Sequence, residues 1–501
     1  MESPAEAAVL PSALYRAAQV REIDRRAIQE HGIPGYELMC RAGAAAYATL
    51  CRRWPAGPLT VLCGAGNNGG DGYVIARLAQ QDGRPVRLLY LQDPHRLRGD
   101  AYTAYAAAAA SGVPMAPFAA AGLVGAAVIV DALLGTGLTR PVEGIWRAAI
   151  EAINTQPAPV LAVDIPSGLC ADSGAALGLA VRAAVTVTFI ALKRGLFTGQ
   201  GPDCSGALCY ADLGVPPAWY ADLEPAARRY AGEDLPVLLP PRLRGAHKGR
   251  YGHVLVVGGE HGMAGAARMC AEAAARCGAG LVSLATRPEH AAWMALARPE
   301  LMAHGIPDAA ALEPLLRRAS VVALGPGLGR GEWGRALFER VLESTLPLVV
   351  DADGLNLLAE RPRRRERWIL TPHPGEAARL LNASVAEVEA DRFHAATELA
   401  RRYGGVTVLK GAGSLIAADA ADSVPWVNQS GNPGMATGGM GDVLTGVIAA
   451  LLAQGLPPTD AARAAVYLHG RAGDLAAADG ERGLLASDLF PHLRRLVNPP
   501  C

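Results

Sequence analysis

Short apolar runs rich in Val, Ile and Leu alternate with stretches rich in Ala, Leu and Arg along almost the whole chain. The runs have the length of strands, and the stretches between them are long enough for helices. This alternation is typical of α/β domains, in which mostly parallel strands form a sheet covered by helices. Because a chain of 501 residues is too long for a single hydrophobic core, we expect more than one such domain.

The predicted strands fall into two groups separated by a Pro-rich interval. The first group is Leu59–Cys63, Val86–Leu91, Ala127–Asp131, Val160–Asp164 and Val185–Ile190. The second group is His253–Val257, Gly280–Ala285, Ser320–Leu324, Leu348–Asp351, Trp368–Leu370 and Thr407–Leu409. Strand spacing is lost between residues 213 and 244, so we place the domain boundary between residues 222 and 223, which gives domains 1–222 and 223–501. Helices are predicted over Ala13–Glu30 and, as one long Ala-rich segment, from Gly441 to Asp479.

Composition excludes several classes of protein. The formal net charge is zero, which gives no electrostatic reason to expect nucleic acid or an acidic membrane surface as a partner. The start, MESPAEAAVLPSALY, lacks the basic cluster of a signal peptide, and no apolar stretch has the length of a membrane span. The nine Cys residues form no CxxC pair, so reduced cysteines in a cytoplasmic protein are expected. The apolar character of such α/β chains favours a homo-oligomer.

Lysine is scarce, and its positions are informative. Of 47 basic residues only Lys193, Lys248 and Lys410 are lysines, and each lies in a Gly-containing motif (ALKRG, HKGRYG and LKGAGS). A compact ammonium group among so many guanidinium groups suggests a contact with phosphate. Chance in an Arg-biased sequence is the alternative interpretation.

In the first half, the strand TVLC runs into GAGNNGGDG and then into a helix. Such a Gly-rich turn presents backbone N–H groups and the positive end of a helix to an anion. Asp131 and Asp164 end two further strands, and ligands collect at the carboxyl ends of parallel strands. We therefore expect Asp71, Asp131 and Asp164 to face one crevice, although a lone strand-end Asp often only caps a turn. Oxygen ligands from Asn68, Asp131 and Ser167 would suit an alkali or alkaline-earth ion.

In the second half, GGMGD opens an apolar helix and places Asp442 beside stacked backbone donors. This arrangement stabilises an anion and puts a carboxylate within reach of it, which is the layout of phosphoryl-transfer sites in the ribokinase-like superfamily. The loop LKGAGS, with Lys410, is the candidate for holding nucleotide phosphates. A small-molecule kinase is one enzyme that this layout would fit.

The strings GNNGGDGYVIARLA, VDALLGTGL, AVDIPSG and TFIALKRGLFTG closely resemble the NAD(P)H-hydrate epimerase family over about residues 10–220. The resemblance implies a Rossmann-like three-layer αβα domain that binds a hydrated nicotinamide cofactor beside K⁺. It implies Asp164 as the acid/base and Asn68, Asp131 and Ser167 as potassium ligands. The substrate contacts that it implies are Asn67, Asn68, Gly69, Gly70, Asp71, Gly135, Thr136, Gly137, Leu138, Thr139, Arg140, Pro141 and Asp164. Arg194 stands where the family usually has Pro, which leaves the role of Lys193 open.

The strings HKGRYGHVLVVGG, GMAGA, GPGLG, HPGE and NPGMATGGMGDVLTG resemble ADP-dependent NAD(P)H-hydrate dehydratases over about residues 235–498. The resemblance implies a ribokinase-like αβα domain with ADP as co-substrate and Mg²⁺ as its metal. The implied hydrate contacts are Ala264, Gly327, His373 and the catalytic Asp442. The implied nucleotide contacts are Lys410, Gly411, Ala412, Gly413, Ser414 and Gly441.

Together the two resemblances predict a bifunctional enzyme that repairs the hydrates of NADH and NADPH. The first half would interconvert the R and S epimers, and the second half would dehydrate the S epimer. The alternative is a vitamin-type kinase fused to a non-catalytic binding module. HPGE, GMAGA and the intact NNGGDG string favour the repair enzyme over this alternative.

Overall fold

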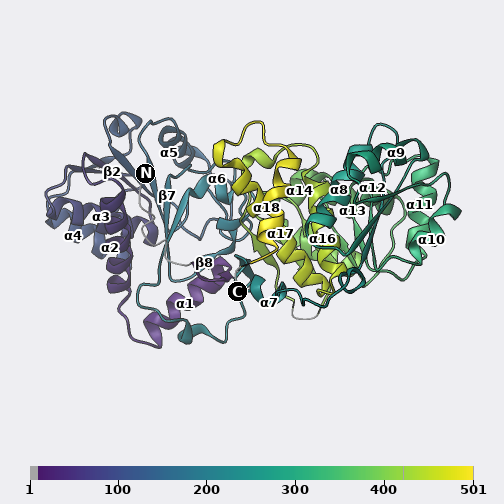
Figure 1. The fold of residues 1–501 in the computed structure, drawn as a ribbon. Coiled ribbons are helices and arrows are strands. Elements are labelled where there is room, and N and C mark those ends of the chain that lie inside the picture. The colour runs from purple at the N-terminus through teal and green to yellow at the C-terminus, as the bar shows by residue number, and fades with distance from the viewer. Residues whose placement is uncertain (1–9, 421–422, 500–501) are drawn as a thin grey trace. The chain divides into compact units, whose positions relative to one another are not determined.

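The computed structural model describes residues 10–420 and 423–499 (Figure 1). The acidic start of the chain and Cys501 therefore lie outside the described residues. The chain forms two compact units, Met1–Arg228 and Arg229–Cys501. The boundary predicted between residues 222 and 223 precedes a strand, β10 (Ala227–Tyr230), which the Pro-rich composition of this stretch did not indicate. No helix in the described ranges combines the length and apolarity needed to cross a membrane.

The N-terminal unit is built on a parallel sheet with strand order β4-β3-β2-β5-β6-β7-β9. Its strands are β2 (Leu59–Cys63), β3 (Val86–Tyr90), β4 (Met115–Pro117), β5 (Val128–Ala132), β6 (Val160–Val163), β7 (Val185–Phe189) and β9 (Ala207–Ala211). Its longer helices are α1 (Ala17–Gln29), α2 (Gly35–Arg53), α3 (Asn67–Gln81), α4 (Gly99–Ala110) and α5 (Gly144–Asn154), followed by the short α6 (Gly201–Ser205). The order reverses between β2 and β5, which makes the carboxyl ends of these strands the place where a ligand is expected.

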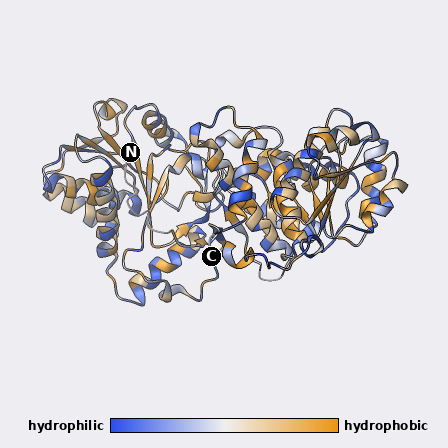
Figure 2. Ribbon diagram, viewed as in Figure 1, coloured by the Kyte–Doolittle hydropathy of each residue, from blue (hydrophilic) through white to orange (hydrophobic). Residues whose placement is uncertain are grey.

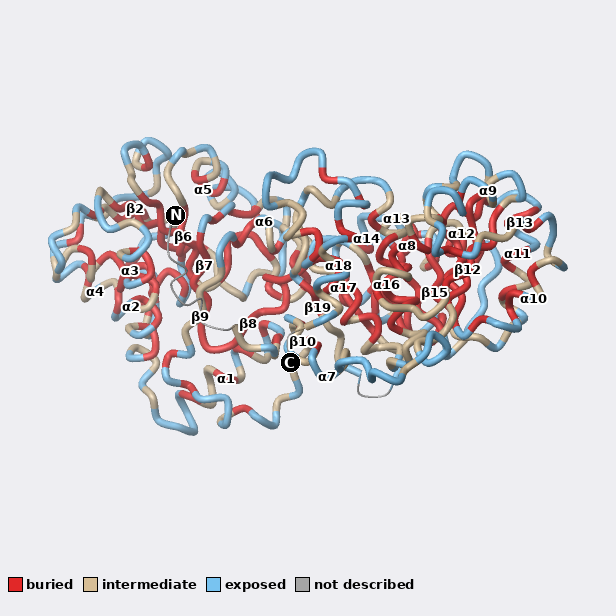
Figure 3. Tube along the Cα trace, in the orientation of Figure 1, coloured by how far each residue is buried: buried red, intermediate tan, exposed pale blue. Residues whose placement is uncertain are grey.

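Both faces of this sheet are covered because both sides of its strands are apolar. In β2, Val61 and Cys63 belong to the core shared with α2, α3 and α4, whereas Leu62 belongs to a second core shared with α5. Since alternate residues of a strand point to opposite faces, the continuous apolar run LTVLC requires helices on both sides. Figure 2 shows the central strands β2, β5, β6 and β7 as largely hydrophobic, and Figure 3 shows them as buried. The three-layer α/β/α architecture predicted for the first half is confirmed.

The helix predicted over Ala13–Glu30 is wrong at its start. Ala13–Tyr15 is a strand, β1, which pairs in parallel with β8 (Leu192–Lys193) and antiparallel with β10. Helix α1 begins only at Ala17, and its backbone N–H donates to the Asp172 carboxylate at 2.7 Å. Local sequence did not indicate the strand, because its partners lie far along the chain.

The C-terminal unit has a sheet with strand order β13-β12-β11-β14-β15-β16-β17-β18-β19, parallel from β13 to β17 and antiparallel from there to β19. The strands are β11 (His253–Val257), β12 (Leu281–Thr286), β13 (Met302–Gly305), β14 (Val321–Leu324), β15 (Leu348–Val350), β16 (Trp368–Leu370), β17 (Val406–Leu409), β18 (Ser414–Ala418) and β19 (Trp426–Asn428). The order reverses between β11 and β14, so this pair marks the corresponding ligand edge.

Helices also form two layers in this unit. Their bounds are α7 (Leu235–Leu238), α8 (Ala264–Arg276), α9 (Pro288–Ala297), α10 (Glu313–Leu316), α11 (Glu332–Leu342), α12 (Ala352–Glu360), α13 (Pro374–Leu381), α14 (Val385–Ala390), α15 (Arg392–Tyr403), α16 (Met440–Ala453), α17 (Pro458–Ala476) and α18 (Leu489–Leu496). Helices α8, α16, α17 and α18 share one core with the sheet. Helices α11, α12, α13 and α15 pack next to one another in this order, with α11 against β14 and α15 against β17 and β18.

The single long helix predicted from Gly441 to Asp479 is wrong, because two helices, α16 and α17, occupy this segment. The first ends at Ala453, and Gly455 then adopts a φ of +95°, a left-handed conformation that favours glycine. Pro457 and Pro458 follow, and proline is readily accepted at the start of a new helix. The continuous Ala-rich composition concealed this turn.

Candidate active sites

The N-terminal unit contains a cavity of about 930 Å³ at the carboxyl ends of β2, β5 and β6. It lies at the reversal of strand order, where the topology predicts a ligand. Of the substrate contacts expected from the sequence, those that line it are Asn67, Asn68, Asp71, Gly135, Thr136, Gly137, Leu138, Thr139, Arg140, Pro141 and Asp164. The structure therefore gathers in one cavity residues that are spread over almost 100 positions of sequence.

Gly69 and Gly70 are not among the lining residues of this cavity. A Cβ on Gly69 would lie 2.2 Å from the carbonyl oxygen of Gly64, and a Cβ on Gly70 would lie 2.5 Å from Met39 Cε. Both glycines thus allow the first turn of α3 to pack closely against its surroundings. Gly69 and Gly70 therefore serve close packing, whereas Asn67 and Asn68 line the cavity.

A buried cluster of oxygen atoms lies beside the cavity. The Ser167 hydroxyl donates to Asp131 Oδ1 at 2.6 Å, and the Ser167 backbone N–H donates to Asp131 Oδ2 at 2.8 Å. Asp131 is fully buried, and burial raises its pKa to about 6, opposed by the hydrogen bonds from Ser167 and Leu133. Asn68, the third residue expected to bind potassium, lies against Gly135, where an added Cβ would be 3.3 Å from Asn68 Cβ.

The oxygen atoms of Asn68, Asp131 and Ser167 would suit a hard cation such as potassium. The carboxamide oxygen and nitrogen of Asn68 are both buried and have no hydrogen-bond partner among the described residues. An unpartnered buried amide is costly, and a cation next to its oxygen would remove part of this cost. Asp131 supplies a negative charge, and all the oxygen ligands are of the hard type that alkali and alkaline-earth ions prefer.

Asp164 and Lys193 form an ion pair on the cavity wall. Asp164 has a φ of +66°, a conformation that Asp adopts more readily than most residues. Its Oδ1 also accepts from the Phe189 backbone N–H at 3.2 Å. Lys193 is almost fully buried and donates to the Phe189 carbonyl at 2.9 Å and to the Thr188 hydroxyl at 3.1 Å. These hydrogen bonds hold the Lys193 side chain toward Asp164. The next residue, Arg194, is the one that stands where the family usually has Pro.

Two of the other carboxyl groups that line the same cavity have a raised pKa. Burial raises the pKa of Asp71 well above its usual value, with the charges of Asp164 and Asp24 adding to the effect and that of Lys193 opposing it. Burial likewise raises the pKa of Asp24, on α1, to about 6. The sequence interpretation included Asp71 but missed Asp24, which lies in an ordinary amphipathic helix without a motif.

In the C-terminal unit, the loops after β11 and β14 interlock at the corresponding edge of the sheet. The Glu260 backbone N–H donates to the Gly327 carbonyl at 2.6 Å. Gly327 has a φ of +59°, and a Cβ there would lie 2.5 Å from the Met263 carbonyl oxygen. Ala264 begins α8 directly after Met263. The structure thus brings together Ala264 and Gly327, both of which the sequence interpretation expected to contact the hydrate.

A charged cluster lies at the start of α16. Lys410 Nζ donates to Asp351 Oδ1 at 2.7 Å and lies 3.9 Å from Glu376 Oε2. A Cβ on Gly441 would lie 3.2 Å from Lys410 Nζ and 3.4 Å from Asp351 Oδ2, so the glycine brings the backbone close to this pair. The predicted Lys410, Gly441 and Asp442 are therefore neighbours.

The pKa values in this cluster move in opposite directions. Burial raises the pKa of Asp442 to about 7, with the charge of Asp351 adding to the effect and that of Lys410 opposing it. Burial also raises the pKa of Glu376 to about 7. Burial acts on Asp351 in the same direction, but Lys410 and hydrogen bonds, one of them from Thr445 at 2.9 Å, bring its pKa below the usual value. Asp351 is thus the charged partner of Lys410, and Asp442 can exchange a proton near neutral pH.

Asp351 and Glu376 were missed by the sequence interpretation. Asp351 directly follows β15, so the rule that singled out Asp131 and Asp164 would have found it. Glu376 belongs to the HPGE string, from which only His373 was chosen. In the structure, His373 Nδ1 accepts from the Gly375 N–H at 3.0 Å, and the His373 N–H donates to Glu376 Oε2 at 2.8 Å. His373 is therefore the N-cap of α13 and is half exposed.

The remaining predicted nucleotide contacts form the turn between β17 and β18. Gly411 has a φ of +140°, and the Ser414 hydroxyl donates to its carbonyl at 3.0 Å. Arg392, which is almost fully buried, donates to the Lys410 carbonyl at 3.0 Å and supports this turn from below. Gly411 and Ala412 are exposed, whereas Gly413 and Ser414 are partly buried.

Two α/β units, each with ionisable side chains at the carboxyl edge of its sheet, define a two-domain α/β enzyme with one site in each domain. The family model of the YjeF-related protein N-terminus matches residues 35–195. The family model of NAD(P)H-hydrate dehydratase matches residues 254–495. Both matches cover the strands and loops that form the sites described above.

Similar proteins cover nearly the whole of this chain. Bifunctional NAD(P)H-hydrate repair enzymes named Nnr are 53% identical in Coxiella burnetii, over 97% of this chain and 99% of the relative, and 47% identical in Escherichia coli, over 98% and 95%. A solved ribokinase-like superfamily protein of Enterococcus faecalis is 28% identical, covers 55% of this chain and 96% of its own, and superposes with a TM-score of 0.51. The chain belongs to the bifunctional NAD(P)H-hydrate repair enzyme family. The ribokinase-like fold predicted for the second half is confirmed.

Proposed function

We propose that this enzyme repairs the hydrates of NADH and NADPH in two steps. The N-terminal unit interconverts the R and S epimers at C6 of the hydrated ring, and the C-terminal unit dehydrates the S epimer with ADP. One observation supports the proposal most directly: each unit has a carboxyl group near a lysine at the ligand edge of its sheet. This carboxyl group is Asp164 in the N-terminal unit and Asp442 in the C-terminal unit.

In the epimerase step, C6 must lose and regain its configuration, which requires proton transfer at the hydroxyl group. A positioned carboxylate contributes about 10²–10⁴-fold to such a reaction. Asp164 is the assigned group because it lines the cavity and is held by Lys193 and the Phe189 N–H. The mobile parts of the substrate would be fixed by Asn67 and by the loop from Gly135 to Pro141.

Potassium belongs to the proposal for the N-terminal unit. Asn68, Asp131 and Ser167 would hold the ion, as the unpartnered Asn68 amide and the buried Asp131 carboxylate suggest. When bound, it would supply a positive charge for the negatively charged parts of the substrate. In addition, it would offset the burial of the Asp131 charge.

The dehydratase step has to make a good leaving group from a hydroxyl group. Asp442 takes the proton of the C6 hydroxyl, whose oxygen then attacks the terminal phosphorus of ADP, and AMP leaves. The lone pair of the ring nitrogen then expels phosphate and forms an iminium ion. Water takes the C5 proton, and the electron pair of the C5–H bond forms the C5=C6 bond of NADH or NADPH. A pKa near 7 suits Asp442 to this task, because a base is most effective when its pKa lies near the operating pH.

Binding of ADP is assigned to Lys410, Gly441 and the turn from Gly411 to Ser414. The backbone N–H groups at the start of α16 suit the transferring phosphoryl group, since helix N-termini attract anions. Ala264, Gly327 and His373 would contact the hydrate. Mg²⁺ would arrive with ADP, because phosphate oxygens and waters are its usual ligands.

The setting of the enzyme is part of the same proposal. The cysteines of the described residues are all free thiols, which suits the reducing cytoplasm. A homo-oligomer is proposed on the basis of composition. No nucleic acid is needed as a partner, since the substrates are small molecules.

The experiment that tests the proposal incubates the enzyme with mixed R and S hydrates and either ADP or ATP. Chromatography should show both epimers disappearing as NADH or NADPH appears, with AMP and phosphate formed from ADP. Without nucleotide, the two epimers should only interconvert. A phosphorylated alcohol accumulating with no restored dihydronicotinamide would instead support a kinase, and the proposal would be rejected.

A further inference from the structure

Helix α1 forms one wall of the epimerase cavity. Val20, Arg21, Asp24 and Ile28 line the cavity, and their spacing places them along one face of a helix. The match to the YjeF-related family model begins only at residue 35, so α1 lies outside the part that the family model describes. This helix therefore adds the Asp24 carboxyl group to the site, and no sequence motif marks this residue.

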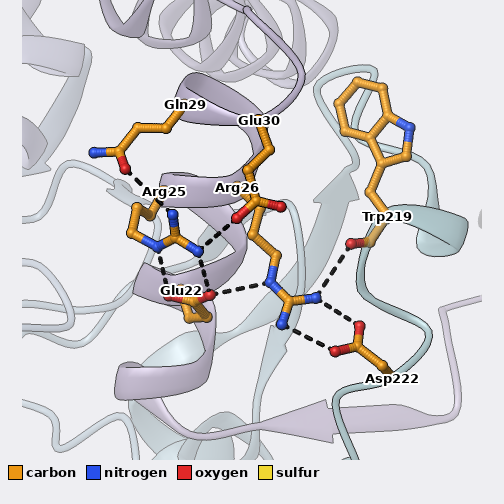
Figure 4. A network of polar contacts seen from close by, with 7 residues as sticks. All are labelled: Glu22, Arg25, Arg26, Gln29, Glu30, Trp219 and Asp222. Atoms are coloured by element: carbon orange, nitrogen blue, oxygen red, sulfur yellow. Dashed lines mark hydrogen bonds and ion pairs between the residues drawn. The ribbon is translucent and has the colours of Figure 1, made fainter.

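The path of the chain fixes α1 relative to Lys193. Strand β1 leads into the helix and pairs with β8 in a register that puts Tyr15 opposite Lys193. On the opposite side of α1, Arg26 donates to Asp222 Oδ2 at 3.0 Å and contacts the Trp219 carbonyl at 3.4 Å (Figure 4). Glu22 bridges Arg25 and Arg26 in the same network. Helix α1 is therefore held on its outer face, while Asp24 faces the cavity.

Asp24 and Asp164 differ in their surroundings. Asp164 carries the negative charge of an ion pair with Lys193 and accepts a backbone hydrogen bond. Asp24 has no hydrogen-bond or ion-pair partner among the described residues, and burial raises its pKa to about 6, with Asp164 adding to the effect and Lys193 opposing it. The other charged side chains that line the cavity are Arg21, Asp71, Asp100, Arg140 and Glu143. One carboxyl group held in an ion pair and one without such a partner, in the same cavity, can serve as a base and an acid.

We propose that Asp24 is the second proton carrier of the epimerase, and that it exchanges the roles of acid and base with Asp164. This inference rests on the proposed epimerase function. An epimerase must act on both configurations of C6, so it needs one group that donates and one that accepts in each direction. A cavity that holds both Asp24 and Asp164 provides this pair.

The reaction balances with these two groups and water. Asp24 in its acid form donates its proton to the C6 hydroxyl, the C6–O bond breaks, and water leaves with the electron pair. The lone pair of the ring nitrogen forms the C=N bond of an iminium ion. Water then attacks C6 from the other face, the C=N electron pair returns to nitrogen, and Asp164 takes the released proton. The opposite direction uses Asp164 as the acid and Asp24 as the base.

The test compares Asp24→Asn with the wild-type enzyme in the interconversion of purified R and S hydrates, followed by chromatography without nucleotide. The uncatalysed rate is subtracted at each pH. In the wild-type enzyme, kcat/KM should fall as pH rises above about 6, because Asp24 then loses its acid form. Asp24→Asn should lower kcat by about 10²–10⁴-fold, and the residual rate should lack this alkaline limb.

Two controls separate chemistry from structure. Glu22→Gln changes the outer face of the same helix and should keep the wild-type rate and pH profile. Asp24→Glu keeps a carboxyl group and should keep the limb at reduced kcat, which decides the matter if Asp24→Asn does not fold. Dehydration of purified S hydrate with ADP should be unchanged in all three variants.

The outcomes are distinct. If the wild-type enzyme does not interconvert the epimers, the proposed epimerase function fails. If it does, but Asp24→Asn retains the wild-type kcat or loses rate with an unchanged pH profile, Asp24 is not a proton carrier and the inference is overturned.

Discussion

The pKa of Asp442 leads to a prediction about the pH dependence of dehydration. Burial raises this pKa to about 7, and the base form is the one that accepts the hydroxyl proton. At pH 6 about one tenth of the enzyme carries the base form, and at pH 8 about nine tenths does, so kcat should rise about tenfold between these values. The value of kcat should rise with pH because Asp442 acts as a base. A general acid at this position would make kcat fall as pH rises.

The rise of kcat with pH forms a limb of the pH profile, and its midpoint depends on the charges next to Asp442. Removing one of these charges should therefore shift the limb in a direction that can be predicted. Lys410 lowers the pKa of Asp442, so Lys410→Met should shift the limb to higher pH at saturating substrate. Asp351 raises the pKa of Asp442, so Asp351→Asn should shift the limb to lower pH. The assay follows the near-ultraviolet absorbance of the restored dihydronicotinamide with purified S hydrate and ADP.

Glu376 provides the matched control, since burial raises its pKa to about 7 as well. Glu376→Gln removes the titrating group, while its side-chain oxygen can still accept the His373 N–H that caps α13. The limb should persist in this variant, and Asp442→Asn should have no measurable dehydration while it still binds ADP. The assignment of Asp442 as the base would be refuted if the rise of kcat with pH disappeared in Glu376→Gln and kept its midpoint in Lys410→Met.

Three further predictions concern the N-terminal unit. Asp164→Asn should fold, because Asn also tolerates the left-handed backbone at this position. It should lower epimerisation by about 10²–10⁴-fold and leave dehydration of the S epimer unchanged; near wild-type epimerisation would exclude Asp164 as the acid/base. Asp131→Asn removes the charge of the oxygen cluster, so the potassium concentration for half-maximal epimerisation should rise in a titration at constant ionic strength, and an unchanged value would contradict the potassium site. Gly69→Ala places a Cβ 2.2 Å from the Gly64 carbonyl oxygen and should destabilise the unit by about 1–3 kcal/mol, seen as a lower urea midpoint; an unchanged midpoint would show that the backbone can shift.

Much of the fold could be predicted from the sequence, because the strands are continuous apolar runs. Leu59–Cys63, His253–Val257 and Trp368–Leu370 are strands with the predicted bounds. Such runs are buried on both faces, so their composition alone indicates a parallel sheet between helices. Ala13–Tyr15 could not be found in this way, since it is a strand only through pairing with distant residues.

The candidate sites could be predicted only where a residue lies in a glycine-rich loop or at the end of a strand. Asp131, Asp164 and Asp442 met this condition: in the structure Asp131 pairs with Ser167, Asp164 pairs with Lys193, and Asp442 lies near Lys410. Asp131 is buried beside the cavity and does not line it, which differs from the crevice expected for all three strand-end carboxylates. Asp24 did not, because its contribution depends on which face of α1 meets the cavity. That choice is made by tertiary packing, which neither the helical pattern nor a motif encodes.

The pairing of β1 with β8 has a practical consequence for dissecting this enzyme. A recombinant N-terminal fragment cut where the family similarity begins, at residue 35, would lack both β1 and α1. Such a fragment would expose the apolar face that Val20, Ile23 and Ala27 cover, and its cavity would be open on that side. A fragment intended for separate study of epimerisation should therefore begin upstream of Ala13 and extend through β10.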